Sequence, residues 1–163
     1  MKAIVIAFLF PVLFANAQSS FDKKITEAAK QLKCEIPGQQ QPVTLNAQLV
    51  SSSDSLAIIV KVAIAPGWHI YSYVPQNQPY IPIDHILQLP DDVRAVGKWQ
   101  STEPMSTAND PGVLIYETEA LFVQKEVKNA GAKPGKISAG LYYQTCNLRQ
   151  CLQPVEKSFE LSY

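Results

Sequence analysis

The sequence lacks the features that mark several large functional classes. It has no basic cluster, and 14 Lys and Arg residues balance 14 Asp and Glu residues, which argues against a nucleic-acid partner. It has no glycine-rich phosphate loop and no G-x-S-x-G elbow, so neither a nucleotide site nor a hydrolase site of that type is expected. It has only two histidines, and their order with the cysteines lacks the paired spacing of zinc ligands. We therefore expect no metal and no organic cofactor.

The one long apolar run stands at the N-terminus and predicts export. Lys2 precedes the run, residues 3–14, and Ala15-Asn16-Ala17 forms a small-x-small cleavage site before Gln18. The run is too short for a comfortable membrane span, and the alternative is a short N-terminal anchor. No later stretch could cross a bilayer, so we expect no integral membrane segment and a mature chain in an oxidising compartment.

After the signal peptide, the pattern predicts one domain. Apolar residues recur at helical spacing over 21–32, which indicates a short amphipathic helix or a mobile arm. A polar linker follows over 38–42, and from Val43 the apolar residues alternate with period two. We therefore divide the chain into a signal peptide (1–17), an N-terminal arm with its linker (18–42) and a β-domain (43–163).

About eight or nine short strands are expected in the β-domain, and they favour an antiparallel β-sandwich. A barrel is the alternative that such patterns separate least well. A turn is expected at 51–55 and a loop at 103–112. The strands are predicted at 43–49, 56–64, 68–73, 83–89, 93–99, 113–116, 121–127, 137–143 and 155–161.

Two cysteines near the end of the chain are the candidate functional residues. Cys146 and Cys151 lie between two predicted strands, and the four residues between them suit a hairpin loop whose flanking residues form a disulfide. Closing so short a loop is worth only roughly 2 kcal/mol in the loop-entropy model. The residues alone leave two functions open: an exchangeable redox site, or a staple in a sandwich that binds a protein or a sugar.

The neighbours of the pair allow thiol chemistry without requiring it. Arg149 lies inside the loop and could favour a thiolate, although it could equally be a solvated loop charge. Leu148 and Leu152 could offer an apolar docking rim. The C-x-x-C spacing and βαβ pattern of a thioredoxin are absent. Cys34 has no partner by simple counting, and we expect it to be free.

Other aromatic and imidazole residues are assigned structural positions. Trp68, Trp99, Tyr71 and Tyr73 could line a carbohydrate or peptide groove, but in a sandwich such residues are more often core residues, and we expect them there. His85 stands at a strand position, and we expect it at the surface or on an edge.

The order of several motifs resembles the N-terminal periplasmic domain of the thiol:disulfide interchange protein DsbD family. The clearest is Tyr143-Gln144-Thr145-Cys146, followed after four residues by Cys151-Leu152-Gln153-Pro154 and an alternating last strand. The resemblance runs from about Val43 to Tyr163. It rests also on the segments Pro66-Gly67-Trp68-His69-Ile70-Tyr71, Leu87-Gln88-Leu89-Pro90, Gly97-Lys98-Trp99 and Tyr116-Glu117.

This resemblance implies an immunoglobulin-like sandwich with a task in electron transfer. Such a domain takes electrons from a thioredoxin-like or membrane donor and passes them to periplasmic thiol proteins, including those of cytochrome c biogenesis. By position, Cys151 would form the mixed disulfide with a partner and Cys146 would resolve it.

The resemblance also implies residues that shape the site. His69 and Tyr71 stand where the family places aromatics beside the cysteines, and His69 could tune a thiol or relay a proton. The segment 103–112 corresponds to a cap loop, with Met105 as the candidate shield, and Tyr143 belongs to the cysteine motif. The alternatives are a strand histidine bound to backbone and an ordinary surface methionine.

Two departures from the family pattern stand out. The best-known members have one more residue between the cysteines. The sequence also lacks the membrane segments and the C-terminal thioredoxin-like domain of full-length DsbD, so we expect a stand-alone version that takes its electrons from another polypeptide.

Overall fold

A computed structural model describes residues 19–108 and 110–163. Within them the chain forms one helix and a succession of antiparallel strands. The elements are α1 (Ser20–Gln31), β1 (Val43–Ser52), β2 (Ser55–Ile64), β3 (Trp68–Tyr73), β4 (Asp84–Gln88), β5 (Val93–Ser101), β6 (Met105–Ser106), β7 (Leu114–Tyr116), β8 (Glu119–Lys128), β9 (Lys136–Tyr143), β10 (Thr145–Asn147) and β11 (Val155–Ser162).

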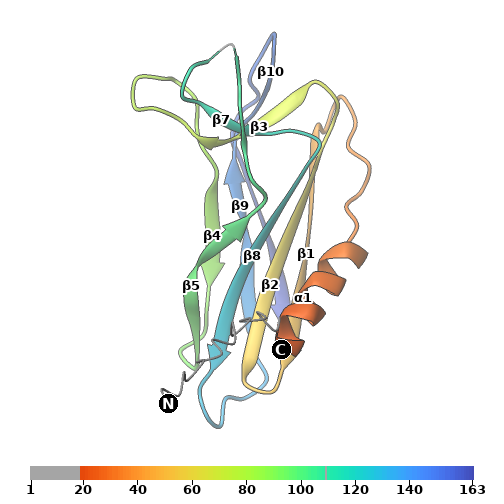
Figure 1. The fold of residues 1–163 in the computed structure, drawn as a ribbon, viewed down its shortest axis with the longest axis vertical. Coiled ribbons are helices and arrows are strands. Elements are labelled where there is room, and N and C mark those ends of the chain that lie inside the picture. Colours follow the sequence, from red (N-terminus) through yellow and green to blue (C-terminus); the bar gives the residue numbers. More distant parts are fainter. Residues whose placement is uncertain (1–18, 109) are drawn as a thin grey trace, which may run out of the picture.

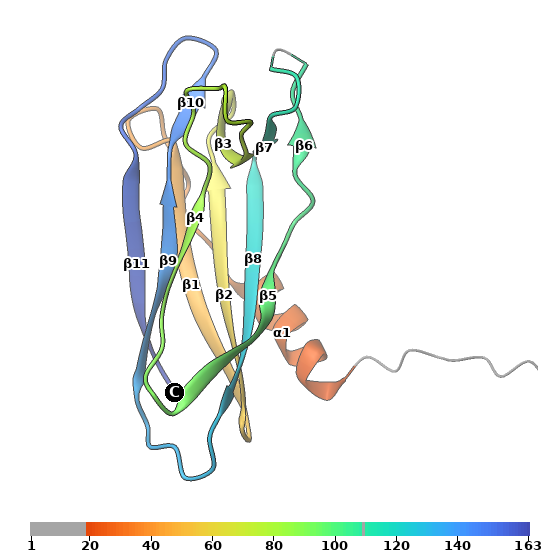
Figure 2. The same cartoon turned by 90° about the vertical axis from the view of Figure 1, so that its left-hand side faces the viewer.

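Two sheets form the layers of a sandwich, and a third sheet lies at one end. The strand order is β1-β2-β8-β5 in one layer and β11-β9-β4 in the other. The core draws on both layers, with Val60 and Phe122 from the first and Ile137 and Leu141 from the second. The third sheet, β10-β3-β7-β6, occupies the upper end of the molecule in Figures 1 and 2. The predicted antiparallel sandwich is therefore confirmed.

Strand β2 is buried on both faces because α1 covers its outer side. Ile58 and Val60 face the sandwich core, whereas Ile59 packs with Ile25 and Ala29 of the helix. Figure 1 shows α1 lying along β1 and β2. This second cluster explains why the sequence of β2 is a nearly continuous apolar run, although strands with one solvated face alternate.

The predicted elements agree with the structure to within a few residues. The helix runs from Ser20 to Gln31, and the side chain of Ser19 caps it by accepting a hydrogen bond from the Asp22 backbone N–H. Strands β1 and β2 extend into the region predicted as a turn, which shortens to Ser53 and Asp54. The predicted loop at 103–112 contains the short strand β6.

The aromatic predictions are confirmed in part. Of the two positions expected for His85, the edge is confirmed and the surface is not. Trp68 and Tyr71 are buried and Trp99 packs against the core, but Tyr73 is 55% exposed. His85 lies on the edge strand β4, yet its ring stacks on Trp99 at 4.7 Å and its Nε2 atom is buried. The sequence of β4 does not show this, because the burial comes from β5 across the sandwich.

The predicted signal peptide, residues 1–17, lies outside the described residues. Within the described part of the chain, no helix combines the length and hydrophobicity that crossing a bilayer requires.

Candidate functional site

The cysteine pair lies at the end of the β9–β11 hairpin, at the top of Figure 1. The chain leaves β9 at Gln144 and passes into the third sheet, β10-β3-β7-β6, which we call the end sheet. There β10 pairs with β3. Cys146 on β10 is disulfide-bonded to Cys151 and forms an antiparallel bridge with it. The disulfide that the spacing allows is therefore present, and the change of sheet places it beside β3.

Hydrogen bonds hold the loop between the cysteines. The Oδ1 atom of Asn147 accepts from the backbone N–H groups of Arg149 and Gln150, at 2.8 and 2.9 Å. Behind the disulfide, the backbone N–H of Leu152 donates to the Thr145 carbonyl at 2.9 Å. An asparagine side chain that bonds its own turn stabilises the loop conformation independently of a cross-link.

The two cysteines differ sharply in burial. Cys146 is 1% exposed and packs in a small apolar cluster with Tyr71, Val113 and Ile115. Cys151 is exposed. Thiol–disulfide exchange requires the attacking thiolate to reach a sulfur. An incoming thiolate can therefore approach the disulfide through Cys151 and not through Cys146.

Cys151 borders a cavity of about 560 Å³ between the hairpin and the end sheet. The cavity brings together three of the predicted site residues, His69, Tyr71 and Arg149, with Cys151. Its other lining residues are Tyr80, Thr107, Asp110, Asn147, Leu148 and Gln150.

His69 reaches this cavity from β3. The register pairs His69 directly with Cys146, and the Oγ1 hydroxyl of Thr145 donates to the His69 carbonyl at 3.0 Å. The Nε2 atom of His69 lies 3.1 Å from the hydroxyl of Tyr71. Burial lowers the pKa of His69, and the negative charges of Glu117 and Asp110 offset part of that effect. The ring is therefore neutral at neutral pH.

Tyr71 is held by an aromatic stack that the sequence analysis missed. Tyr80 lies in the segment between β3 and β4, and its ring stacks on Tyr71 with centroids 4.7 Å apart. Burial raises the pKa of Tyr71, and Tyr80 and Asp110 add to the effect, so the hydroxyl stays protonated. Tyr80 stands in no periodic pattern, and its place between prolines is the only signal in the sequence.

Gln144 joins this segment to the hairpin, a role that the sequence does not predict. Its Oε1 atom accepts from the Ile81 backbone N–H at 3.1 Å, and its Nε2 atom donates to the Leu152 carbonyl at 3.4 Å. Gln144 thus ties the segment that carries Tyr80 to the segment that follows Cys151.

The predicted cap segment reaches the cavity through residues other than the one expected. Met105 is 52% exposed on β6 and is not among the cavity's lining residues, whereas Thr107 and Asp110 are. Asn109 lies outside the described residues. Asp110 brings a carboxyl group to the same cavity as Arg149, whose side chain is exposed.

Tyr143 and Leu152 lie on another side of the hairpin. Tyr143 is a core residue, and burial raises its pKa to about 12. It lines a separate cavity of about 430 Å³ together with Leu152 and Val155. Leu148, at the loop tip, is 87% exposed, whereas Leu152 packs against the core. Of the two leucines expected as an apolar rim, Leu148 is the one that projects.

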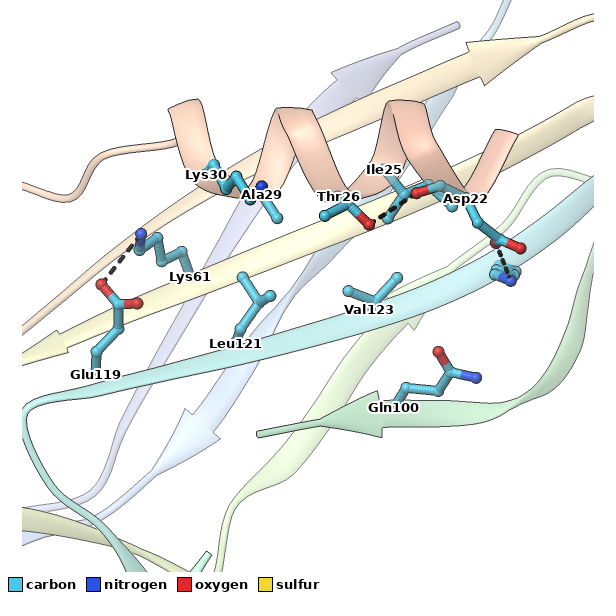
Figure 3. A pocket seen from close by; sticks show the side chains of 11 residues that line it. Asp22, Ile25, Thr26, Ala29, Lys30, Lys61, Gln100, Glu119, Leu121 and Val123 are labelled. Atoms are coloured by element: carbon cyan, nitrogen blue, oxygen red, sulfur yellow. Dashed lines mark hydrogen bonds and ion pairs between the residues drawn. The ribbon is translucent and has the colours of Figure 1, made fainter. Parts of the chain in front are cut away.

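A larger cavity, of about 680 Å³, lies between α1 and β8 and contains no cysteine (Figure 3). Apolar residues such as Leu121 and Val123 line it, and two ion pairs lie along it. Asp22 of α1 pairs with Lys125 of β8 at 2.6 Å and holds the helix on the sheet, whereas Lys61 and Glu119 join two strands of the sheet at 3.1 Å. We assign these residues no chemistry.

Cys34 is the free cysteine, as expected. Its thiol donates to the Lys61 carbonyl at 3.2 Å, and burial raises its pKa. A thiol with a raised pKa is a poor nucleophile at neutral pH. We assign Cys34 no part in the exchange chemistry.

The fold and the site together define an antiparallel β-sandwich with a disulfide at one end, of which one sulfur is buried and the other belongs to an exposed residue. The chain belongs to the family of the N-terminal domain of the thiol:disulfide interchange protein DsbD, whose family model matches residues 28–163. Membership supports a role in thiol:disulfide exchange with thiol proteins. The resemblance found in the motifs is confirmed.

Solved structures of related domains are similar to this chain at low sequence identity. The N-terminal domain of Neisseria meningitidis DsbD in the reduced form has 21% identity and a TM-score of 0.48, over 73% of this chain and 85% of that one. The N-terminal periplasmic domain of Proteus mirabilis ScsB has 18% identity and a TM-score of 0.47, over 79% of this chain and 49% of that one. No curated protein sequence matches the chain.

Proposed function

We propose that the protein is exported to the periplasm and relays electrons through the Cys146–Cys151 pair. The donor is a thioredoxin-like domain or a membrane electron-transfer protein, and the acceptors are periplasmic thiol proteins, including those of cytochrome c biogenesis. The unequal burial of the two sulfurs carries the proposal, because it gives the pair one point of attack and one protected sulfur.

The oxidised protein accepts electrons in two exchange steps. A donor thiolate attacks the Cys151 sulfur, the Cys146–Cys151 bond breaks, and the electron pair of that bond stays on Cys146. The second donor thiolate then attacks the donor sulfur of the mixed disulfide and releases Cys151. The donor leaves as a disulfide, and the protein holds two thiols.

The reduced protein passes the same two electrons to a client. The Cys151 thiolate attacks the client disulfide, forms a mixed disulfide and releases one client thiolate. Cys146 then attacks the Cys151 sulfur, which re-forms the internal disulfide and releases the second client thiolate. No metal or organic cofactor takes part in either direction.

The loop geometry favours this function over a staple. Asn147 fixes the turn through its own hydrogen bonds, so the hairpin does not depend on the disulfide for its shape. A structural cross-link of so short a loop contributes roughly 2 kcal/mol. Mild dithiothreitol is therefore expected to open the bond while the near-ultraviolet circular dichroism of the domain persists.

The Cys146→Ser variant is expected to trap its partner. Without the resolving thiol, the mixed disulfide between Cys151 and a partner cannot be released from within, so a covalent adduct accumulates and disappears on reduction. The measurement is non-reducing electrophoresis and mass analysis of periplasmic extracts that contain the variant.

The matched control is Cys151→Ser, which keeps only the buried thiol. It is expected to form no adduct, because a partner cannot reach Cys146. If neither variant captures a partner, or if Cys151→Ser captures partners as well as Cys146→Ser does, the proposed function is wrong.

A further inference from the structure

The buried sulfur of the pair poses a chemical problem that the proposed function leaves unsolved. In the last step of client reduction, Cys146 must attack as a thiolate. Its side chain is 1% exposed and lies among Tyr71, Val113 and Ile115. A thiol enclosed by apolar groups ionises reluctantly, so the step needs a nearby base that takes the proton as the sulfur attacks.

The register of the end sheet places a base beside this sulfur. Cys146 on β10 and His69 on β3 are direct antiparallel partners. Side chains of such partners lie on the same face of the sheet, with Cβ atoms about 4.5–5.5 Å apart. His69 also lines the cavity that Cys151 borders, so His69 is the cross-strand partner of one cysteine and shares a cavity with the other. The other histidine, His85, stacks on Trp99 and is not among the residues that line this cavity.

Tyr71 orients the imidazole of His69. The Nε2 atom lies 3.1 Å from the Tyr71 hydroxyl, and the two rings meet edge to face with centroids 5.0 Å apart. Tyr80 in turn stacks on Tyr71. The hydrogen bond to Tyr71 fits either tautomer of His69. In the tautomer whose Nε2–H donates to the Tyr71 oxygen, Nδ1 is an acceptor without a hydrogen-bond partner among the described residues, and the ring can act as a base through it.

The surrounding charges keep the base usable at neutral pH. Burial lowers the pKa of His69, so the ring is neutral and can accept a proton. Two negative charges oppose this effect and raise the pKa of His69. They belong to Glu117, just after β7, and to Asp110 in the cap segment. The remaining charged group at the cavity is Arg149, on the exposed loop. Cys151 and the hydroxyls of Tyr71 and Tyr80 are the other titratable groups that line this cavity.

We propose that His69 is the general base for Cys146, a role that rests on the proposed function. As Cys146 attacks the mixed disulfide, its proton moves to the Nδ1 atom of His69 and the Cys146–Cys151 bond forms. The bond between Cys151 and the client breaks, and the client sulfur leaves with the electron pair. His69 then gives the proton to the departing client thiolate across the shared cavity. In the reverse direction, protonated His69 supplies the proton to Cys146 when a donor attacks Cys151.

A two-step probe separates this role from the reactivity of Cys151. The reduced protein is mixed with 5,5′-dithiobis(2-nitrobenzoate) in a stopped-flow instrument. The first release of thionitrobenzoate reports the attack by Cys151, and the second reports the resolution by Cys146. The His69→Gln variant is expected to keep the first rate within about twofold and to slow the second on the order of 100-fold at pH 7, at the lower end of general-base effects.

The pH dependence of the second step gives a readout that a purely structural role would not change. In the parent, the resolution rate is expected to level off once His69 is neutral. In His69→Gln, it is expected to keep rising with pH until the thiol itself ionises. His85→Gln is the matched control, since it removes the other histidine, and its second step is expected to match that of the parent.

Tyr71→Phe provides a second test that removes a single hydroxyl. Losing the partner of Nε2 is expected to slow resolution several-fold and to shift the point at which the parent profile levels off. Equal second-step rates and profiles in the parent, His69→Gln and Tyr71→Phe would overturn the role of His69 and leave the proposed function intact. A parent protein that releases no thionitrobenzoate in the first step would instead contradict the proposed function itself.

Discussion

At pH 8, the Glu126→Gln variant is expected to be more stable than the parent protein by roughly 2–4 kcal/mol, and at pH 4 the two are expected to be equally stable. Glu126 lies on β8 and is 2% exposed, and neither carboxylate oxygen has a hydrogen-bond partner among the described residues. Burial raises its pKa to about 8. An ionised carboxylate in such a place is strongly disfavoured.

The direction of the pH effect follows from the two pKa values of Glu126. The unfolded chain loses the proton near the ordinary value of 4.5, whereas the folded protein holds it to about pH 8. The folded state therefore binds the proton more tightly between these values. Its free energy of unfolding falls as pH rises from 4.5 to 8, and the loss is complete above that range. A glutamine cannot ionise, so it removes this part of the pH dependence.

Urea unfolding of both proteins between pH 4 and pH 9 measures the effect. Glu156→Gln, on the exposed face of β11, is the matched control and is expected to leave the pH dependence unchanged. If the parent and Glu126→Gln keep a constant difference in free energy of unfolding across this range, Glu126 is not the buried acid that the fold predicts.

The Gly140→Ala variant is expected to lose about 3 kcal/mol of stability, at the upper end of the usual cost of overpacking. Gly140 is buried in β9 where that strand pairs with β11. A Cβ atom there would overlap the Lys157 carbonyl oxygen and lie 2.6 Å from the Cα atom of Ser158. These are backbone atoms of the partner strand, so no side-chain rotation relieves the clash. The strands would have to separate along the hairpin that carries both cysteines.

The midpoint of urea unfolding tests this expectation, and Gly38→Ala provides the control. Nothing lies within 4 Å of a Cβ atom built at Gly38, so that variant is expected to unfold close to the parent midpoint. An unchanged midpoint in Gly140→Ala would show that β9 and β11 leave room for a Cβ atom at position 140, and it would contradict the close pairing described here.

The sequence predicts the strands well wherever burial is one-sided or continuous. Leu56, Ile58 and Val60 mark β2 because they face the core, and the positions between them are apolar because α1 covers them. The spacing of the cysteines predicts the hairpin disulfide because a four-residue loop leaves few geometries. These features depend on local chemistry, which a single sequence records.

The sequence does not predict features created by contacts between distant segments. Tyr80 and Gln144 belong to the site only because a long connection folds back over the end sheet. The stacking of the His85 ring on Trp99 depends on β5 in the facing layer. Similarly, the sequence alone indicates that Glu126 is an ordinary polar residue of an alternating strand. Its burial comes from the packing of the two sheets.

The reduction potential of the Cys146–Cys151 pair tests the central claim most directly. The protein is equilibrated in dithiol buffers of graded potential, and its free thiols are counted by mass after alkylation. An electron carrier is expected to have a value of roughly −180 to −270 mV, among those of exchange proteins. A value well below about −300 mV would identify a structural staple and contradict the account.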